Sequence, residues 1–214
     1  MSGADTPSHW WQWHADYQDP ESALSQRLAV VVARTRSAVE AAPPGPVRLV
    51  SACAGQGRDV VGARRGHPRR DDVRGRLVEL DPGNAQAART ALAEAGLMAI
   101  DVVEADAGVT DAYLGAAPAD VLLLCGIFGN VPDSDIRTTV RHASMLCAAG
   151  AHVIWTRHRR LPDLTPTLRG WFAEGGFEEV AFDSPDDASF AVGTHRLVGP
   201  GETLAPGIRL FLFR

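Results

Sequence analysis

Two short segments hold the residues whose types and spacing indicate chemistry. Residues 47–60 read Val-Arg-Leu-Val-Ser-Ala-Cys-Ala-Gly-Gln-Gly-Arg-Asp-Val, an apolar strand followed by a turn of small residues and the start of a helix. Residues 76–82 read Arg-Leu-Val-Glu-Leu-Asp-Pro, and their second acid stands about 24 residues after the last glycine of the turn. Glycines let a ligand approach the backbone, and a carboxylate after the next strand accepts hydrogen bonds from ribose hydroxyls. The sequence therefore predicts a site for a cofactor that contains a nucleoside.

The sequence excludes several other cofactors. A dinucleotide site requires Gly-x-Gly-x-x-Gly, and Val60 stands where the third glycine is needed. All 21 basic residues are arginine, so the chain lacks the lysine of a P-loop and of pyridoxal phosphate attachment. The three cysteines, Cys53, Cys125 and Cys147, have no Cys-x-x-Cys spacing, and we expect neither a disulfide framework nor a metal site.

Composition limits the class of protein. The chain has 214 residues, of which 45% are hydrophobic and 22% charged, as expected for one globular domain with or without a short appendage. The net charge of −5 argues against a nucleic-acid partner, because such proteins usually carry a basic surface. No apolar run approaches the roughly 20 residues of a membrane span, and residues 1–7 lack the features of a signal peptide. We expect a cytoplasmic protein without membrane contact; the sequence does not predict its oligomeric state.

The elements that must position the two segments alternate along the chain. A helix over 20–41, with Asp19 as its N-cap, precedes strands predicted over 47–53, 75–80, 99–105, 120–125, 151–156 and 177–182. Helices are predicted between them over 57–65, 84–95, 109–115, 133–147, where Asp133 is the cap, and 165–175. The alternation indicates an α/β fold of three layers with a mostly parallel sheet. Residues 190–198 and 208–213 are both extended, and their short connection predicts an antiparallel pair at the end of the chain.

From residue 47 to 214, the strand order, motif positions and antiparallel end resemble a class I S-adenosylmethionine-dependent methyltransferase. The segments Cys-Ala-Gly-Gln-Gly-Arg-Asp and Leu-Val-Glu-Leu-Asp-Pro are most similar to those of a group of uncharacterised bacterial methyltransferases. The resemblance implies a Rossmann-like methyltransferase fold with a seven-stranded sheet, and S-adenosylmethionine as the cofactor. We expect the chain to divide into a lid segment with a helix over residues 1–45 and an S-adenosylmethionine-binding domain over residues 46–214.

The resemblance also assigns residues to the cofactor. The loop under the cofactor consists of Ala52, Cys53, Ala54, Gly55 and Gly57. Asp81 takes the place of the acid that binds the ribose, because it stands at the end of the strand; Glu79, on the same face, is the alternative. Asp106, with Ala107 beside it, matches the acid that receives the adenine amino group. Cys125 and Gly126 occupy the position that lines the transfer site, and Asn130 follows in the same segment as a substrate contact.

Two positions depart from the family pattern. Its first motif usually begins acid-x-Gly, and this chain has Ser51 and Cys53 at those places. The usual acidic contact to the methionine amine is therefore missing, and a residue from the N-terminal segment is one possible replacement. Arg27, on the helix over 20–41, is predicted to reach the methionine carboxylate.

The acceptor is expected near the loops at 125–132 and 156–164. His158 is the first candidate for a general base, and His14 is the second. Arg157 is predicted to bind a carboxylate or phosphate of the substrate. The alternative interpretation of its loop is a solvated segment in which one arginine pairs with Asp163.

The segment over residues 10–17 contains three of the five tryptophans. It is predicted either to form a lid over the cofactor and substrate or to attach the following helix to the domain. If it is a lid, Tyr17 contacts the cofactor and Trp13 the substrate.

Three functions remain open from the sequence. The first is methyl transfer to a small-molecule acceptor by in-line displacement. The second is a non-methylating S-adenosylmethionine enzyme that cyclises the cofactor or transfers its aminocarboxypropyl group. The third is a non-catalytic binding protein on the same fold, which the departures at Ser51 and Cys53 suggest.

Overall fold

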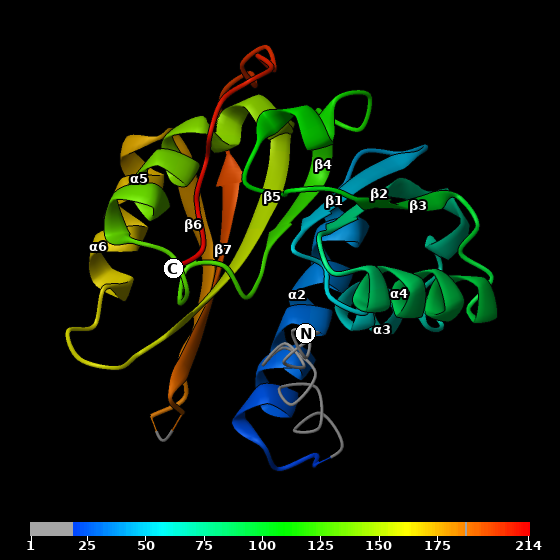
Figure 1. Ribbon diagram of the computed structural model, residues 1–214, viewed down its shortest axis with the longest axis horizontal. Coiled ribbons are helices and arrows are strands. Elements are labelled where there is room, and N and C mark those ends of the chain that lie inside the picture. Colours follow the sequence, from blue (N-terminus) through cyan, green and yellow to red (C-terminus); the bar gives the residue numbers. More distant parts are fainter. Residues whose placement is uncertain (1–18, 187) are drawn as a thin grey trace, which may run out of the picture.

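The computed structural model describes residues 19–186 and 188–214. Its centre is a seven-stranded sheet with the order β3-β2-β1-β4-β5-β7-β6 (Figure 1). The strands are β1 (Val47–Ala52), β2 (Val73–Glu79), β3 (Ile100–Glu104), β4 (Ala119–Leu124), β5 (Cys147–His158), β6 (Phe177–Asp183) and β7 (Phe190–Leu197). The ladders from β3 through β5 are parallel, and β7 pairs antiparallel with both β5 and β6. The predicted mostly parallel α/β fold is confirmed.

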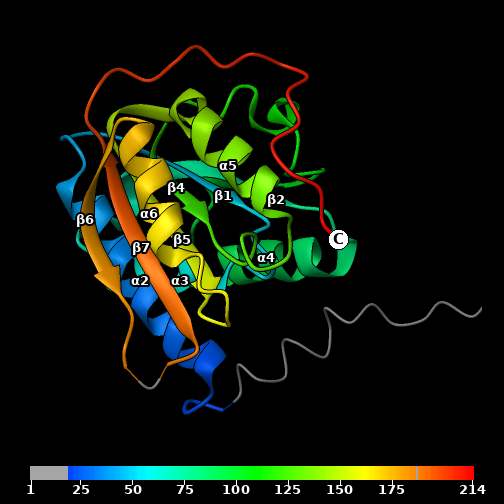
Figure 2. The same ribbon diagram turned by 90° about the vertical axis from the view of Figure 1, so that its left-hand side faces the viewer.

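Helices cover both faces of the sheet (Figures 1 and 2). One face is covered by α2 (Ala23–Ala41), α3 (Arg58–Arg64) and α4 (Pro82–Glu94), and the other by α5 (Asp133–His142) and α6 (Thr165–Glu174). Successive residues of β4 point to opposite faces, so that Leu122 packs in one core cluster and Leu123 in the other. Burial on both faces explains why this strand is a continuous apolar run. None of the helices in the described residues is long and apolar enough to cross a membrane.

Three predicted helix boundaries need correction. The first helix begins at Ala23 with Ser22 as its N-cap, whose hydroxyl accepts the Ser25 N–H, and Asp19 lies before it. The segment predicted over 109–115 is a short 3-10 helix, Thr110–Tyr113, and the one predicted over 133–147 divides into α5 and a 3-10 turn, Ala143–Leu146. Asp133 is the first residue of α5 rather than its cap. Local hydrogen bonds decide these ends, and sequence patterns locate them only to within a few residues.

The end of the chain differs from the prediction. Residues 208–213 do not pair with β7, because β5 and β6 already occupy both edges of that strand. The tail instead passes α5 and reaches the end of β3, where Arg209 forms a bridge with Val109 and the Leu210 N–H donates to the Gly108 carbonyl at 2.8 Å (Figure 2). The C-terminus therefore lies beside the carboxyl ends of the central strands.

Candidate functional site

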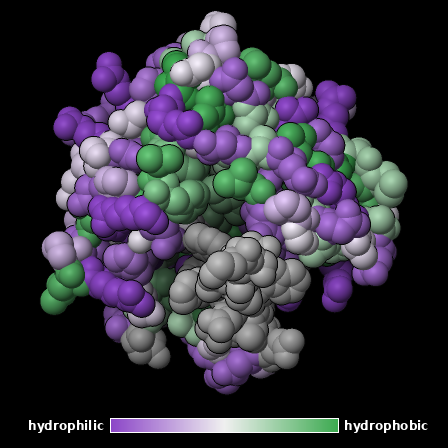
Figure 3. Space-filling view, viewed as in Figure 1, coloured by the Kyte–Doolittle hydropathy of each residue, from purple (hydrophilic) through white to green (hydrophobic). Residues whose placement is uncertain are grey.

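A cavity of about 440 Å³ opens at the carboxyl ends of the central strands. It lies where the strand order reverses between β1 and β4, which is the usual ligand position in open α/β sheets. The molecular surface is hollowed at this place, and hydrophobic side chains gather around the hollow (Figure 3). Ten of the residues predicted for the cofactor line the cavity: Arg27, Cys53, Ala54, Gly55, Glu79, Asp81, Asp106, Ala107, Cys125 and Gly126.

The turn after β1 has the backbone that its small residues allow. Cys53, Gly55 and Gly57 all have a positive φ, at 52°, 55° and 68°. A Cβ on Gly57 would lie 2.9 Å from Leu77 Cδ2, so glycine is needed there for space as well as for conformation. Gly57 and Ala52 are buried and do not line the cavity; they shape the turn from below.

The two acids at the end of β2 have different roles. The strand ends at Glu79, whose Oε2 accepts the Gly55 N–H at 2.7 Å and whose Oε1 accepts the Asp81 N–H at 2.9 Å. Asp81 is the N-cap of α4, and its Oδ1 accepts the Asn84 N–H at 2.8 Å. The strand-end position that favoured Asp81 as the ribose acid therefore belongs to Glu79, which is a correction to the sequence interpretation. Glu79 also ties the glycine turn to β2.

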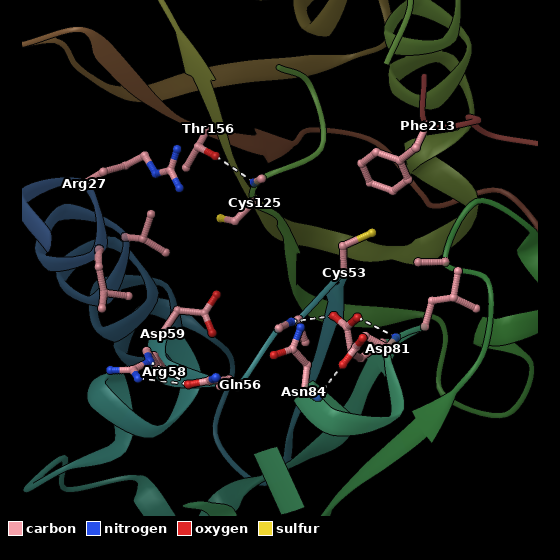
Figure 4. Close-up of a pocket in the computed structure, with 18 of the residues that line it drawn as sticks. Arg27, Cys53, Gln56, Arg58, Asp59, Asp81, Asn84, Cys125, Thr156 and Phe213 are labelled. Carbon is pink, nitrogen blue, oxygen red and sulfur yellow. Dashed lines mark hydrogen bonds between the residues drawn. The ribbon is translucent and has the colours of Figure 1, made fainter. Parts of the chain in front are cut away.

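Asp106 lies in the loop after β3, between the cavity and the tail. Its Oδ1 accepts the Gly108 N–H at 2.8 Å, and its Oδ2 accepts a hydrogen bond from the Arg209 guanidinium. Ala107 is buried, and its carbonyl accepts the Tyr113 hydroxyl at 2.6 Å. The tail also brings Phe213 into the cavity wall (Figure 4). Sequence analysis missed Arg209 and Phe213, because these contacts join positions about a hundred residues apart and no local pattern signals them.

The two cysteines of the cavity lie after the adjacent strands β1 and β4, as expected. Burial raises the pKa of the Cys53 thiol, and the nearby Glu79 and Asp106 carboxylates raise it further. Burial also raises the pKa of the Cys125 thiol. Both thiols are neutral at physiological pH, which opposes a role as thiolate nucleophiles.

The ends of β4 and β5 are joined by side-chain hydrogen bonds. The Gly126 N–H donates to Thr156 Oγ1 at 2.9 Å, and the Asn130 amide donates to the Gly126 carbonyl at 2.8 Å. Thr156 lines the cavity, although it was not predicted as a site residue. Asn130 does not line it and instead fixes its own loop; its carbonyl also accepts the Arg214 N–H.

The predicted acceptor residues Arg157 and His158 are the last two residues of β5 and lie outside the cavity wall. Arg157 is buried; its guanidinium donates to the Phe128 carbonyl and lies 3.6 Å from Asp133. His158 Nδ1 accepts the Arg160 N–H at 3.3 Å, and its ring packs beside Gly129.

Burial and the neighbouring cations Arg157 and Arg160 lower the pKa of His158, so its ring is neutral near pH 7. Arg159 pairs with Asp163 at 3.4 Å, in agreement with the alternative interpretation of this loop.

Sequence analysis did not assign Asp59, which lines the cavity and is only 8% exposed. It is the second residue of α3, and its Oδ1 accepts the Val60 N–H at 2.8 Å. Burial raises the pKa of its carboxyl group to about 6. The sequence did contain a signal for this residue. An acid in the first turn of a helix that directly follows a glycine-bearing loop is expected to lie close to a ligand bound by that loop.

The remaining predicted residues belong to the N-terminal segment. Trp13, His14 and Tyr17 lie outside the described residues, and their assigned roles stay predictions. Arg27 is half-buried on α2 and faces the cavity from the side opposite to Phe213 (Figure 4).

Comparison with known proteins found no matching family model and no matching curated protein. Solved structures do match. An O-methyltransferase family protein from Burkholderia thailandensis has a TM-score of 0.65 and 20% identity over 84% of this chain, which spans 57% of that protein. Magnesium protoporphyrin IX methyltransferase from Synechocystis PCC 6803, solved with S-adenosylmethionine, has a TM-score of 0.67 and 11% identity over 91% of this chain and 99% of its own.

An RNA methyltransferase from Salinibacter ruber, in complex with S-adenosylhomocysteine, has a TM-score of 0.54 and 19% identity over 84% of this chain and 95% of its own. The acceptors named for the last two proteins, magnesium protoporphyrin IX and RNA, differ, but the fold is shared. The chain therefore has the Rossmann-like fold of the S-adenosylmethionine-dependent methyltransferases.

Proposed function

We propose that this protein is an S-adenosylmethionine-dependent methyltransferase that acts on a small-molecule acceptor. The observation that carries the proposal is the cavity, in which the glycine turn after β1 meets acids from the ends of β2 and β3. Its volume of about 440 Å³ falls within the range of small-molecule sites, roughly 300–1,000 Å³. The residues present fit the cofactor, because the turn offers backbone groups and the acids offer acceptors for ribose hydroxyls and an adenine amino group.

Glu79 is the residue that we propose for the ribose. Each of its oxygens accepts one backbone N–H, and a carboxylate has about four acceptor sites in total. It can therefore hold the turn and bind the ribose hydroxyls at once. Asp81 keeps α4 in place beside it and contributes its second oxygen. Asp106 is the acceptor for the adenine amino group, and its ion pair with Arg209 fixes its orientation.

When bound, S-adenosylmethionine supplies a sulfonium methyl group that passes to the acceptor nucleophile, while the electrons of the broken S–CH3 bond remain on sulfur to give S-adenosylhomocysteine. The protein's tasks are to align the two reactants and to exclude water. The Gly126–Thr156 hydrogen bond holds the end of β4 against β5, beside the cavity. His158 is the proposed base for acceptors that must lose a proton, because its lowered pKa leaves the ring neutral.

The net charge of −5 supports a small-molecule acceptor over RNA. The three cysteines are free, which supports the proposed cytoplasmic location.

Calorimetry with S-adenosylhomocysteine tests the cofactor site. We expect one site per chain, and the Glu79→Gln variant should weaken binding at least ~10-fold through loss of charged hydrogen bonds. Glu104→Gln is the matched control, because Glu104 is the register partner of Glu79 at the end of β3 and binds Arg89 outside the cavity. Its affinity should stay within about twofold of the wild type, as for a surface substitution. Failure of the wild type to bind would contradict the proposal.

Product analysis tests the reaction and the acceptor class. The protein is incubated with labelled S-adenosylmethionine and either the small-molecule or the RNA fraction of a bacterial lysate. We expect S-adenosylhomocysteine to form only with the small-molecule fraction. Formation of methylthioadenosine would point instead to aminocarboxypropyl transfer or cyclisation, and label in the RNA would overturn the acceptor class.

A further inference from the structure

Opposite charges stand at one end of the cavity. Arg27 projects from α2 and Asp59 from α3, and both lie on the side of Cys125, away from Asp81 and Phe213 (Figure 4). Asp81 therefore belongs to the opposite end, together with Glu79, which accepts its backbone N–H. A cavity with this arrangement suits a ligand with a nucleoside at one end and a zwitterion at the other.

Asp59 is not explained by the packing of the protein. It is 8% exposed, and the ion pairs among the described residues do not include it. The hydrogen bond from the Val60 N–H stabilises one oxygen, and the carboxylate still faces the cavity. A buried carboxylate without an ion-pair partner destabilises the folded protein, so its presence in a cavity wall indicates a cationic ligand group.

We propose that Asp59 binds the α-ammonium group of the methionine portion of S-adenosylmethionine, next to the α-carboxylate that Arg27 binds. This inference rests on the proposed function. Ser51, the position at which the resemblance would place an acid, is 1% exposed at the end of β1 and does not line the cavity. In this chain the acidic contact is therefore moved from the strand to the first turn of α3.

Two ligands that differ only in the amino acid portion test this contact. S-Adenosylhomocysteine carries the ammonium and carboxylate groups, and 5′-methylthioadenosine has the nucleoside and sulfur without them. We expect Asp59→Asn to lower the affinity for S-adenosylhomocysteine at least ~10-fold and to leave the affinity for methylthioadenosine unchanged. The reason is that a charged hydrogen bond is lost only with the first ligand. Asp133→Asn, which changes another first-turn acid outside the cavity, should affect neither ligand.

Each other outcome overturns a defined claim. Equal binding of S-adenosylhomocysteine by the wild type and Asp59→Asn would overturn the contact, and would leave Asp59 with an acceptor-side role such as a base. Equal weakening of both ligands would also overturn it, because the residue would then only maintain the shape of the cavity. If the wild type binds neither ligand, the proposed function fails instead.

The pH dependence of binding gives a second readout. The charged and titratable groups around Asp59 are Arg27 from α2, Arg58 from its own helix and the Cys125 thiol from the residue after β4. The pKa of Asp59 in the free protein is about 6. Affinity for S-adenosylhomocysteine should therefore fall as the pH drops through about 6, where the carboxylate becomes protonated. The affinity of Asp59→Asn, and that of methylthioadenosine for the wild type, should stay flat over this interval; a flat wild-type profile for S-adenosylhomocysteine would contradict the contact.

Discussion

The two sides of the cavity hold their polar groups in different ways. On the cofactor side, Glu79, Asp81 and Asp59 receive backbone N–H groups and still face the cavity. On the acceptor side, the polar groups of Asn130 and Arg157 bind carbonyls of the loop after β4 and do not line the cavity. The first side is therefore preorganised for a ligand, whereas the second uses its polar groups to hold its own loops together.

The support beneath the two sides differs as well. On the acceptor side, Phe128 packs on Trp155 with ring centroids 6.3 Å apart, and the Trp155 indole donates to His195 Nδ1 at 3.2 Å. His195 in turn stacks on Phe172. On the cofactor side, the turn rests on Leu77 and Ala88 instead. Substitutions on the acceptor side should therefore change the stability of the protein without changing its affinity for the cofactor.

The largest expected effect is a change of stability with pH that has opposite signs for a residue of each side. Burial lowers the pKa of His195 to about 4 from an ordinary 6.5. The unfolded chain then binds the extra proton first, so stability is full above pH 6.5 and falls by up to about 3 kcal/mol as the pH drops to 4. In urea unfolding, the His195→Gln variant should not show this loss of stability between pH 6.5 and pH 4.

Asp59 should give the opposite slope. Its carboxyl pKa is about 6 in the folded protein and 3.8 as the ordinary value, so the folded state binds the proton first. Its ionisation therefore opposes folding above pH 6 and ceases to do so as the pH falls below 4, with a similar size of about 3 kcal/mol. Asp59→Asn should be at least as stable as the wild type at pH 7.5. A loss of stability in this variant at pH 7.5 would contradict the account of a buried carboxylate without an ion-pair partner.

The next effect isolates the support of the glycine turn. Gly57→Ala and Gly66→Ala change residues with φ of 68° and 65°, but only at Gly57 would the new Cβ approach Leu77. We expect a loss of about 1 kcal/mol for Gly66→Ala and about 2–3 kcal/mol for Gly57→Ala in denaturant unfolding. Only Gly57→Ala should lower the affinity for S-adenosylhomocysteine. Equal losses of stability and equal affinities in the two variants would show that the positive φ alone, and not the contact with Leu77, requires glycine.

A smaller effect is expected for the buried arginine of the acceptor side. Arg157→Met keeps the apolar stem but leaves the Phe128 carbonyl without its donor. Stability should fall by about 1–2 kcal/mol, while affinity for S-adenosylhomocysteine stays unchanged. Urea unfolding measures the stability of this variant, and calorimetry measures its affinity. A large loss of affinity for S-adenosylhomocysteine would contradict the assignment of Arg157 to the acceptor side.

His158→Ala should have the smallest effect on the measurements that need no acceptor. The side chain is partly exposed and lies outside the cavity wall. Stability should change by less than about 0.5 kcal/mol, and S-adenosylhomocysteine should bind as to the wild type. Loss of cofactor binding in this variant would move His158 from the acceptor side to the cofactor side.

The features that could be predicted from the sequence are those that depend on interactions between residues close together in the chain. The alternation of strands and helices, the glycine turn and the acids after β2 and β3 depend on local patterns, and all could be read from the chain. The path of residues 208–213 could not, because it depends on the pairing of β7 with β5, a strand that is not its neighbour in the chain and that occupies the edge of β7 left free by β6. The environments of Asp59 and Arg157 also depend on distant packing, so neither the burial of the acid nor the partner of the arginine has a local signal.

Hydrogen–deuterium exchange of the full chain, with and without S-adenosylhomocysteine, tests the central claim most directly. The account predicts that the ligand protects amides in the segments 53–59, 79–84, 106–109 and 125–126, which contain cavity-lining residues at the ends of four strands. Residues 157–164 should exchange at the same rate in both samples. Unchanged exchange in all four segments, or protection confined to residues 157–164, would contradict it.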